Sequence, residues 1–219
     1  MADTTSRTGS RYATPELVDF VNRVHAAHDE ALQLAFDAPV RHDMPAIQVA
    51  PSEGKLLGML AALCGARRAV EVGTLAGYSA IHLARAMPED GVLHCLELEP
   101  RHAEVARASL QAAGMLERTR VHVGPALESL ESLASEAPFD LVFLDADKEG
   151  YPRYGRWALE HLRPGGMLLA DNVYFFGQLM ADTPAAAAMR RFHEETAADF
   201  QSVCIPTPDG LLMAIKPLG

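Results

Sequence analysis

The sequence has no hydrophobic run long enough to cross a lipid bilayer, although 49% of its 219 residues are hydrophobic. It also has no cluster of basic residues, and a formal net charge of −10 argues against a nucleic-acid partner. Its three cysteines, Cys64, Cys95 and Cys204, lack Cys-x-x-Cys spacing, which predicts reduced core thiols and not disulfides or metal ligands. Because the first residues are polar and do not form a signal peptide, we expect a cytoplasmic protein without a membrane partner.

Strand-like and helix-like segments alternate regularly from residue 69 to residue 171. This alternation predicts an α/β fold: a doubly wound, mostly parallel sheet with helices on both faces. Two apolar runs, 200–205 and 211–216, close the chain, and residues 206–210 between them suit a hairpin, hence an antiparallel end to the sheet. We expect a flexible tail over residues 1–11 and a single domain over residues 12–219.

A helical extension precedes the alternating segments. Thr14 offers an N-cap hydroxyl, and Pro15 follows at the first helical position. Apolar residues at helical spacing then predict one helix that reaches about Phe36. This helix either packs on the sheet or serves as a lid or dimer element, and the sequence favours neither role.

The segment over residues 69–80 is a buried strand, a tight glycine turn and the start of a helix. Gly73 and Gly77 bracket the turn, where backbone N–H groups can approach a ligand closely. The spacing is neither the Gly-x-Gly-x-x-Gly of a dinucleotide site nor a P-loop. The pattern that is present, Glu71-x-Gly73-x-x-x-Gly77-x-Ser79, resembles motif I of class I S-adenosylmethionine-dependent methyltransferases.

Four apolar strand-like segments end in carboxylates: Glu71, Glu97, Asp145 and Asp171. In a doubly wound sheet, ligands bind at the carboxyl ends of the strands, so we expect these acids on one edge. Glu97 stands where such folds place the acid that accepts ribose hydroxyls, or it is simply an exposed acid beside Glu99.

Two further stretches follow strand ends. Gly124, Pro125 and Ala126 either wall an adenine ring or only begin a helix. Asp145 with Asp171 and Asn172 forms a set of hard oxygen donors suited to Mg²⁺ or Ca²⁺. Lys148 could reach the same ion-bound substrate, or be an ordinary solvated lysine.

The resemblance becomes closer at Leu-Asp-Ala-Asp-Lys (residues 144–148) and at Asp-Asn (171–172) after a Pro-Gly-Gly turn. These motifs resemble the cation-dependent O-methyltransferases, which include catechol and caffeoyl-CoA O-methyltransferases, and the likeness covers nearly the whole chain beyond the tail. It implies a Rossmann-like seven-stranded sheet whose last strand is antiparallel to its neighbours, and a homodimer.

The same resemblance implies site residues, carried over position by position. Its S-adenosylmethionine contacts are Val49, Glu71, Gly73, Thr74, Ser79, Glu97, Ala126 and Asp147. Its ligands for Mg²⁺, or for Mn²⁺ or Ca²⁺, are Asp145, Asp171 and Asn172, and its general base is Lys148. Its acceptor contacts are Tyr154 and Asp209.

The sequence departs from the family pattern at four places. Ile47 replaces a common methionine and Glu97 a common aspartate. Pro208 replaces the usual glycine before Asp209, and residues 173–177 differ from the usual Thr-Leu-Trp-Gly-Gly type of segment. The last two differences put the identity of the acceptor in doubt, but not the reaction.

The sequence therefore predicts cation-dependent methyl transfer to a hydroxyl of a small aromatic vicinal diol, with Asp145 and Lys148 as catalytic residues. Tyr151, Tyr154, Phe175 and Phe176 could wall this acceptor, or be core or interface residues. A nicotinamide-dependent dehydrogenase would need a different glycine fingerprint, and a nucleic-acid or amine methyltransferase would usually carry an Asn/Asp-Pro-Pro-aromatic motif. The alternative from another class is a catalytically silent S-adenosylmethionine-binding module.

Overall fold

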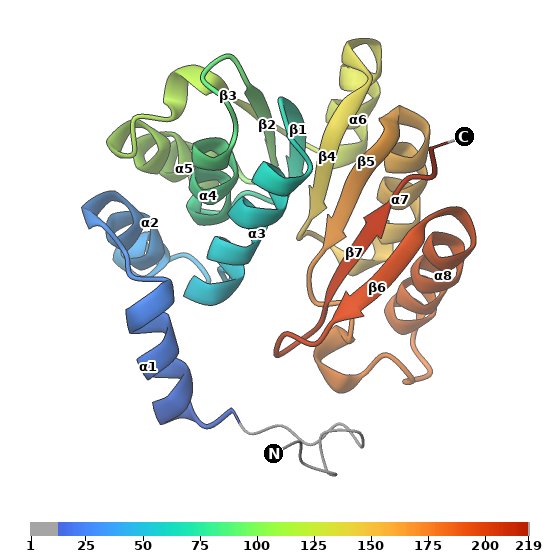
Figure 1. The fold of residues 1–219 in the computed structure, drawn as a ribbon, viewed down its shortest axis with the longest axis horizontal. Coiled ribbons are helices and arrows are strands. Elements are labelled where there is room, and N and C mark those ends of the chain that lie inside the picture. The colour runs from blue at the N-terminus through green and yellow to red at the C-terminus, as the bar shows by residue number, and fades with distance from the viewer. Residues whose placement is uncertain (1–12, 219) are drawn as a thin grey trace.

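The computed structural model describes residues 13–218 and has three layers, with a central sheet covered by helices on both faces (Figure 1). The strands of the sheet are β1 (Arg68–Val72), β2 (Val92–Glu97), β3 (Thr119–Val123), β4 (Phe139–Leu144), β5 (Leu162–Ala170), β6 (Gln201–Ile205) and β7 (Leu211–Ile215). The α-helices are α1 (Pro15–His25), α2 (Glu30–Arg41), α3 (Pro51–Leu63), α4 (Tyr78–Ala86), α5 (Pro100–Ala112), α6 (Ala126–Leu133), α7 (Tyr151–His161) and α8 (Pro184–Asp199).

The seven strands lie in the order β3-β2-β1-β4-β5-β7-β6. Every pair from β3 to β5 is parallel, while β7 is antiparallel to both β5 and β6. The predicted doubly wound, mostly parallel sheet with an antiparallel last strand is thereby confirmed. The strand order reverses between β1 and β4, and that switch point is where open α/β sheets bind ligands.

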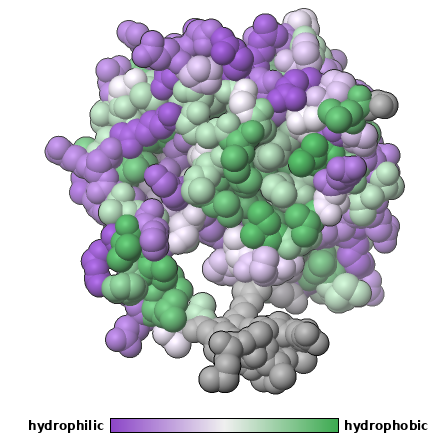
Figure 2. Space-filling model, in the orientation of Figure 1, coloured by the Kyte–Doolittle hydropathy of each residue, from purple (hydrophilic) through white to green (hydrophobic). Residues whose placement is uncertain are grey.

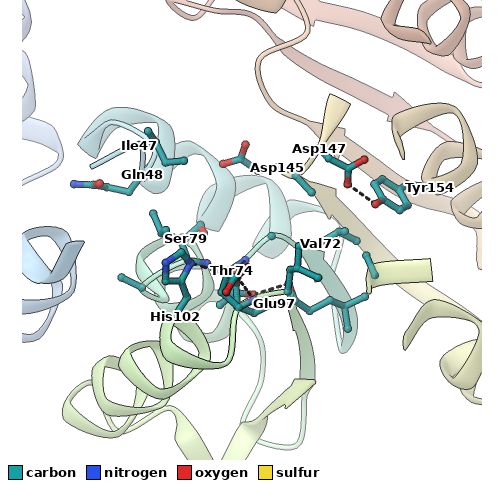
Figure 3. Close-up of a pocket in the computed structure, with 18 of the residues that line it drawn as sticks. Ile47, Gln48, Val72, Thr74, Ser79, Glu97, His102, Asp145, Asp147 and Tyr154 are labelled. Atoms are coloured by element: carbon teal, nitrogen blue, oxygen red, sulfur yellow. Dashed lines mark hydrogen bonds and ion pairs between the residues drawn. The ribbon is translucent and has the colours of Figure 1, made fainter. Parts of the chain in front are cut away.

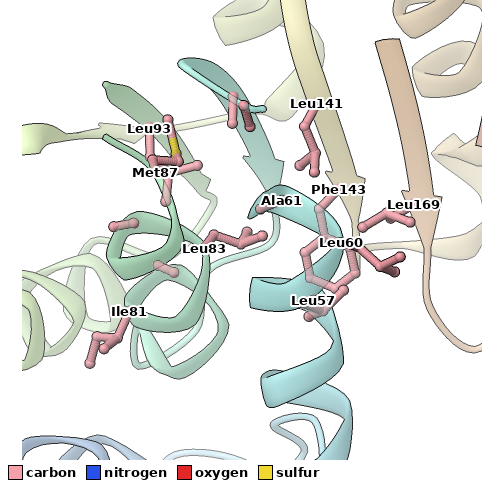
Figure 4. Packing of buried hydrophobic residues seen from close by; sticks show 14 of the residues in the cluster. Leu57, Leu60, Ala61, Ile81, Leu83, Met87, Leu93, Leu141, Phe143 and Leu169 are labelled. Atoms are coloured by element: carbon pink, nitrogen blue, oxygen red, sulfur yellow. The ribbon is translucent and has the colours of Figure 1, made fainter. Parts of the chain in front are cut away.

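Two apolar clusters hold the layers together. Side chains of α3 and α4, including Leu57, Leu60 and Leu83, pack on one face of the sheet against Leu141 and Phe143 (Figure 4). The opposite face is covered by α6, α7 and α8, whose buried residues include Leu130 and Phe192. Because both faces of the central strands are covered, their ends at one edge are the natural place for a site.

The predicted single helix from Thr14 to Phe36 is wrong, because the structure has two helices there. Thr14 caps α1 as expected, accepting from the Leu17 N–H at 3.3 Å, but α1 ends at His25. The Asp29 carboxylate accepts from the Leu32 N–H at 2.9 Å and begins α2. His28 lies in the break, 2.7 Å from the Tyr78 hydroxyl. The contact between His28 and Tyr78 and the N-cap at Asp29 break the chain into two helices, although the apolar residues continue at helical spacing through this segment.

Other boundaries agree to within a few residues, with one informative exception. The predicted turn at residues 163–166 lies inside β5, whose pairing with β4 shifts register between Phe139 and Leu141. The expected tail over residues 1–11 lies outside the described residues. Within residues 13–218, no helix has the length and apolar character needed to cross a membrane.

Candidate functional site at the strand ends

A cavity of about 440 Å³ opens at the switch point between β1 and β4 (Figure 3). We call it the strand-end cavity. Many of the residues predicted from the sequence line it: Val49, Gly73, Thr74, Ser79, Glu97, Ala126, Asp145, Asp147 and Tyr154. Lys148, Asp171, Asn172 and Asp209 do not line it, and Glu71 lies beneath it, bonded to Ser79.

The turn after β1 has the geometry that its glycines predicted. Gly73 has φ +92° and Gly77 has φ +84°, a region that favours glycine. A Cβ on Gly73 would lie 2.0 Å from the carbonyl oxygen of Asp145, so only a glycine lets β1 and β4 approach this closely. Gly77 caps α4, whose N-terminal end therefore faces the cavity.

Glu71 is fully buried at the end of β1, and Ser79 donates a 2.6 Å hydrogen bond to its Oε1. Its Oε2 has no hydrogen-bond partner among the described residues. Burial raises the pKa of Glu71 from 4.5 to about 7, against the opposing effect of Ser79. A buried carboxylate with one unpartnered oxygen is costly, and carboxyl groups with a perturbed pKa are frequent at functional sites.

Glu97, at the end of β2, is buried and held by backbone donors. Its Oε2 accepts from the N–H groups of Thr74 at 3.2 Å and Leu75 at 2.7 Å, and its Oε1 accepts from Glu99 at 3.0 Å. Nδ1 of His102 lies 3.5 Å from Oε1. These bonds fix the Glu97 carboxylate at the edge of the cavity, as a ligand-binding acid requires. The alternative that Glu97 is an exposed acid is wrong, because the residue is buried.

Lys148 lies beside Asp145, just after β4. Its Nζ is 3.4 Å from Asp145 Oδ1 and donates to the Tyr151 hydroxyl at 2.7 Å. The Lys148 side chain is 12% exposed, so it is not the ordinary solvated lysine that the sequence left open. Burial lowers the pKa of Lys148, while Asp145 and Asp171 act in the opposite direction.

Asp171 and Asn172 follow β5, next to the end of β4. The Asn172 amide donates to Asp171 Oδ2 at 3.3 Å, and Asn172 has φ +55°. Burial, followed by the charge of Asp145, raises the pKa of Asp171 from 3.8 to about 7. Burial also raises the pKa of Asp145. A half-buried and a buried carboxylate that repel each other are an arrangement that a bound cation would relieve.

Over residues 13–218, no group of three or more His, Cys, Asp or Glu side chains is arranged to hold a metal ion. The predicted set differs in kind, because its third member is the amide of Asn172. Carboxylate and amide oxygens are the donors that Mg²⁺ and Ca²⁺ prefer. The residues present therefore fit a hard divalent cation in their chemistry.

Tyr154 joins the strand-end cavity through Asp147. The Tyr154 hydroxyl donates to Asp147 Oδ1 at 2.6 Å, and both residues line the cavity. Tyr151 is fully buried, and its hydroxyl lies within 3.2 Å of the Leu144 carbonyl and 3.0 Å of the Asp171 carbonyl. Of the open alternatives for these aromatics, Tyr151 is thus a core residue that ties β4 to β5.

Asp209 holds the loop that follows Asn172. Its Oδ1 accepts from the Phe176 N–H at 2.8 Å, and its carbonyl accepts from the Tyr174 N–H at 2.9 Å. Phe175 and Phe176 have φ of +53° and +51°, conformations that non-glycine residues rarely adopt. Phe176 is 65% exposed, so this strained loop presents an aromatic ring to solvent.

Sequence reasoning missed two residues of the site. His102 contacts Glu97 across the first turn of α5, and Gln48 lines the cavity while its amide donates to the Phe36 carbonyl at 2.8 Å. The signal for His102 was its position five residues after a predicted site acid, in the first turn of α5. No comparable signal marks Gln48, whose place depends on α2.

Comparison with known proteins agrees with this geometry. The profile of the O-methyltransferase family matches residues 23–217. A catechol O-methyltransferase of Niastella koreensis is 40% identical over 213 residues, covering 91% of this chain and 96% of that protein. A catechol O-methyltransferase of Mycobacterium tuberculosis is 43% identical over 175 residues, covering 80% of this chain and 79% of that protein.

A solved structure is similar over the same extent. The O-methyltransferase TomG from Streptomyces achromogenes, in complex with S-adenosylmethionine, superposes with a TM-score of 0.88 and 38% identity. The superposition covers 92% of this chain and 96% of that one. The chain therefore belongs to the O-methyltransferase family and is an S-adenosylmethionine-dependent O-methyltransferase.

Proposed function

We propose that this enzyme methylates one hydroxyl of a small catechol-like acceptor and needs a divalent cation to do so. The observation that carries the proposal is the pair of carboxylates, half-buried Asp145 and buried Asp171, at the ends of neighbouring strands with Lys148 beside them. The names of two similar proteins, both catechol O-methyltransferases, support the acceptor class.

S-adenosylmethionine binds in the strand-end cavity. Glu97 accepts a ribose hydroxyl: three backbone N–H groups fix its carboxylate and leave about one of its roughly four lone-pair positions free. Ala126 lies against the adenine, and Asp147, steadied by Tyr154, lies on the same side of the cavity. Gly73, Thr74, Ser79 and Val49 surround the methionine portion, with Glu71 fixing Ser79 from below.

Asp145, Asp171 and Asn172 hold the cation through their oxygen atoms. A bound Mg²⁺, Mn²⁺ or Ca²⁺ supplies Lewis acidity that favours the ionised form of an acceptor hydroxyl. Lys148 takes the hydroxyl proton on Nζ, and the hydrogen bond to Tyr151 holds Nζ in place for this step. The burial of Asp171 and the low exposure of Lys148 limit the access of water to the reaction.

The acceptor side is formed by the loop that follows Asn172. Phe175 and Phe176 offer aromatic surface there, and Asp209 fixes their backbone. Because these residues replace the family's usual segment, the identity of the vicinal diol depends on this loop.

The direct test is the formation of S-adenosylhomocysteine from S-adenosylmethionine and caffeate, first with Mg²⁺ and then with EDTA. We expect turnover with Mg²⁺, its loss in EDTA, and its recovery when excess Mg²⁺ is added. Equal turnover in EDTA would contradict the cation requirement and the role of Asp145, Asp171 and Asn172.

A second possible outcome would show whether the choice of acceptor or the proposed mechanism is at fault. If S-adenosylmethionine binds but neither condition gives turnover with caffeate, a panel of catechols, flavonoid diols and monophenols decides the acceptor class. Turnover of monophenols alone would contradict the vicinal diol. No observation favours the catalytically silent binding module.

Two further properties complete the proposal. The enzyme is a cytoplasmic homodimer, as its resemblance to the family implies. The exposed apolar face of α1, with Leu17, Phe20 and Val24, supports an association of two chains (Figure 2). Sedimentation equilibrium would measure the mass of the assembly, and a single-chain mass at micromolar concentration would contradict the dimer.

A further inference from the structure

A second cavity, of about 300 Å³, lies between α3 and α4 beside the break that separates α1 from α2. We call it the α3–α4 cavity. It shares no lining residue with the strand-end cavity. Five of its ten lining residues are alanine or glycine, among them Ala62 of α3 and Ala86 of α4. The space exists because these side chains are small, and its volume is at the lower end of the range for ligand sites.

The charge that lines this cavity is unexpected for the protein as a whole. The chain has a net charge of −10, yet the cavity is lined by Lys55, His82 and Arg85 and by no acidic residue. Arg85 also pairs with Asp29 at 2.7 Å, just outside the lining. Burial, and then the charges of His28, Arg85 and Lys55, lower the pKa of His82 to about 4, while Asp29 acts weakly in the opposite direction.

His82 contributes an imidazole ring to the lining of this cavity. Its Nε2 is buried and has no hydrogen bond among the described residues. The ring is fixed in place, because a Cβ on Gly54 of α3 would lie 2.6 Å from its Cδ2, and the Tyr78 ring meets it edge-on at 5.0 Å. Nε2 lies 2.8 Å from the Cβ position of Gly54 and is closed off from the cavity, so His82 forms a rigid wall there.

We propose that the α3–α4 cavity binds a small organic anion, a carboxylate joined to an apolar body. Lys55 and Arg85 attract the negative charge and can donate charge-assisted hydrogen bonds to a carboxylate, and the His82 ring forms part of the wall. Leu32, Met59 and the alanines cover the apolar body. The charges of Lys55 and Arg85 disfavour a cation, and a neutral ligand gains no ionic attraction from them.

The experiment is calorimetric titration of 2-naphthoate into protein saturated with S-adenosylhomocysteine, which fills the strand-end cavity. We expect one equivalent to bind and the neutral analogue 2-naphthamide to bind at least about tenfold more weakly, since a charge-assisted hydrogen bond contributes this much. Lys55→Glu should weaken 2-naphthoate binding by about tenfold or more. Ala62→Phe should abolish binding by filling the cavity.

The controls test whether the Lys55→Glu and Ala62→Phe variants still fold and still bind S-adenosylhomocysteine. Lys55 and Ala62 are exposed on α3, so both variants should keep the wild-type melting temperature and affinity for S-adenosylhomocysteine. Arg67→Glu, the same charge reversal outside the cavity, should leave 2-naphthoate affinity within about twofold of wild type, as expected of an exposed charge at a distance. Displacement of 2-naphthoate by S-adenosylhomocysteine, equal affinity for 2-naphthamide, or wild-type affinity in both Lys55→Glu and Ala62→Phe would each overturn the proposal.

Discussion

Lys148 lies where three side chains meet, between the Asp145 carboxylate at 3.4 Å and the Tyr151 hydroxyl at 2.7 Å. If it removes the acceptor proton, Lys148→Ala should lower kcat by about 10²–10⁴-fold, the range for a lost general base. Affinity for S-adenosylhomocysteine should hardly change, because Lys148 does not line the strand-end cavity. Lys148→Arg keeps the charge but cannot give up its proton at neutral pH, so it should be as slow as Lys148→Ala. Steady-state kinetics and ligand titration measure both quantities, and an active arginine variant would contradict the base.

Glu71 makes the protein less stable at neutral pH. Its folded pKa of about 7 lies above the ordinary 4.5, so the folded state binds more protons between these values. The free energy of unfolding therefore loses this contribution as the pH rises from about 4.5 to about 7. Glu71→Gln should raise the free energy of unfolding at pH 8, by up to roughly 3 kcal/mol, and change it little at pH 4.5. Urea unfolding of the ligand-free protein at both pH values measures the difference, and an equal effect at both would show that burial does not raise this pKa.

At the scale of elements, the close approach of the segments that follow β1 and β4 depends on the missing Cβ of Gly73. Gly73→Ala would introduce both a strained φ and a clash with the Asp145 carbonyl, 2.0 Å from the new atom. Gly65, which follows α3, has φ +65° and nothing within 4 Å of its Cβ position. Gly65→Ala should therefore cost only the left-handed backbone strain, about 1–2 kcal/mol.

The comparison of these two variants isolates the clash. We expect Gly73→Ala to lower the free energy of unfolding clearly more than Gly65→Ala, and to abolish S-adenosylhomocysteine binding by moving Thr74. Thermal unfolding and calorimetric titration measure the two effects. Equal costs would mean that β1 and β4 separate easily at this point.

The loop over residues 172–178 depends on the β6–β7 turn. Each of Phe175 and Phe176 stores backbone strain of about 1–3 kcal/mol, and the Asp209 carboxylate helps to hold Phe176 there. Asp209→Ala should raise the KM of the acceptor by about tenfold, as loss of one charge-assisted hydrogen bond would, and leave the KM of S-adenosylmethionine unchanged. Asp209→Asn keeps an acceptor oxygen at Oδ1 and should retain most acceptor affinity. If the alanine and asparagine variants behave alike, the hydrogen bond to Phe176 is not what positions the loop.

Element prediction from the sequence succeeded where local signals and tertiary structure agree. Thr14 with Pro15 marked the start of α1, and the alternation from residue 69 placed the sheet. It failed at the α1–α2 break, because the contact between His28 and Tyr78 joins residues fifty positions apart. Inside β5 the predicted turn at residues 163–166 is present as a bulge, because pairing with β4 passes from Leu162 directly to Met167 and Gly165 has φ +72°.

For the whole molecule, ligand binding should appear as added stability. S-adenosylhomocysteine at about 100 times its Kd should raise the free energy of unfolding by about 2.7 kcal/mol. Mg²⁺ should raise the melting temperature of the wild-type protein, because it relieves the repulsion between Asp145 and Asp171. Asp145→Asn should abolish the Mg²⁺ effect and preserve that of S-adenosylhomocysteine, whereas Asp90→Asn, at an exposed carboxylate, should preserve both. Differential scanning calorimetry distinguishes these cases, and a Mg²⁺ effect that survives Asp145→Asn would remove Asp145 from the cation site.

The sequence by itself determined the sheet, its antiparallel last strand and the family. Strand periodicity, turn residues and short motifs such as residues 71–79 and 144–148 are local in the chain, so they can be read without coordinates. Only the tertiary structure decided that Lys148 is buried, that Glu71 lacks a partner for one oxygen, and that the α3–α4 cavity is basic. These properties depend on desolvation and on charges from separate helices and strands, and such distances are set only when the elements pack.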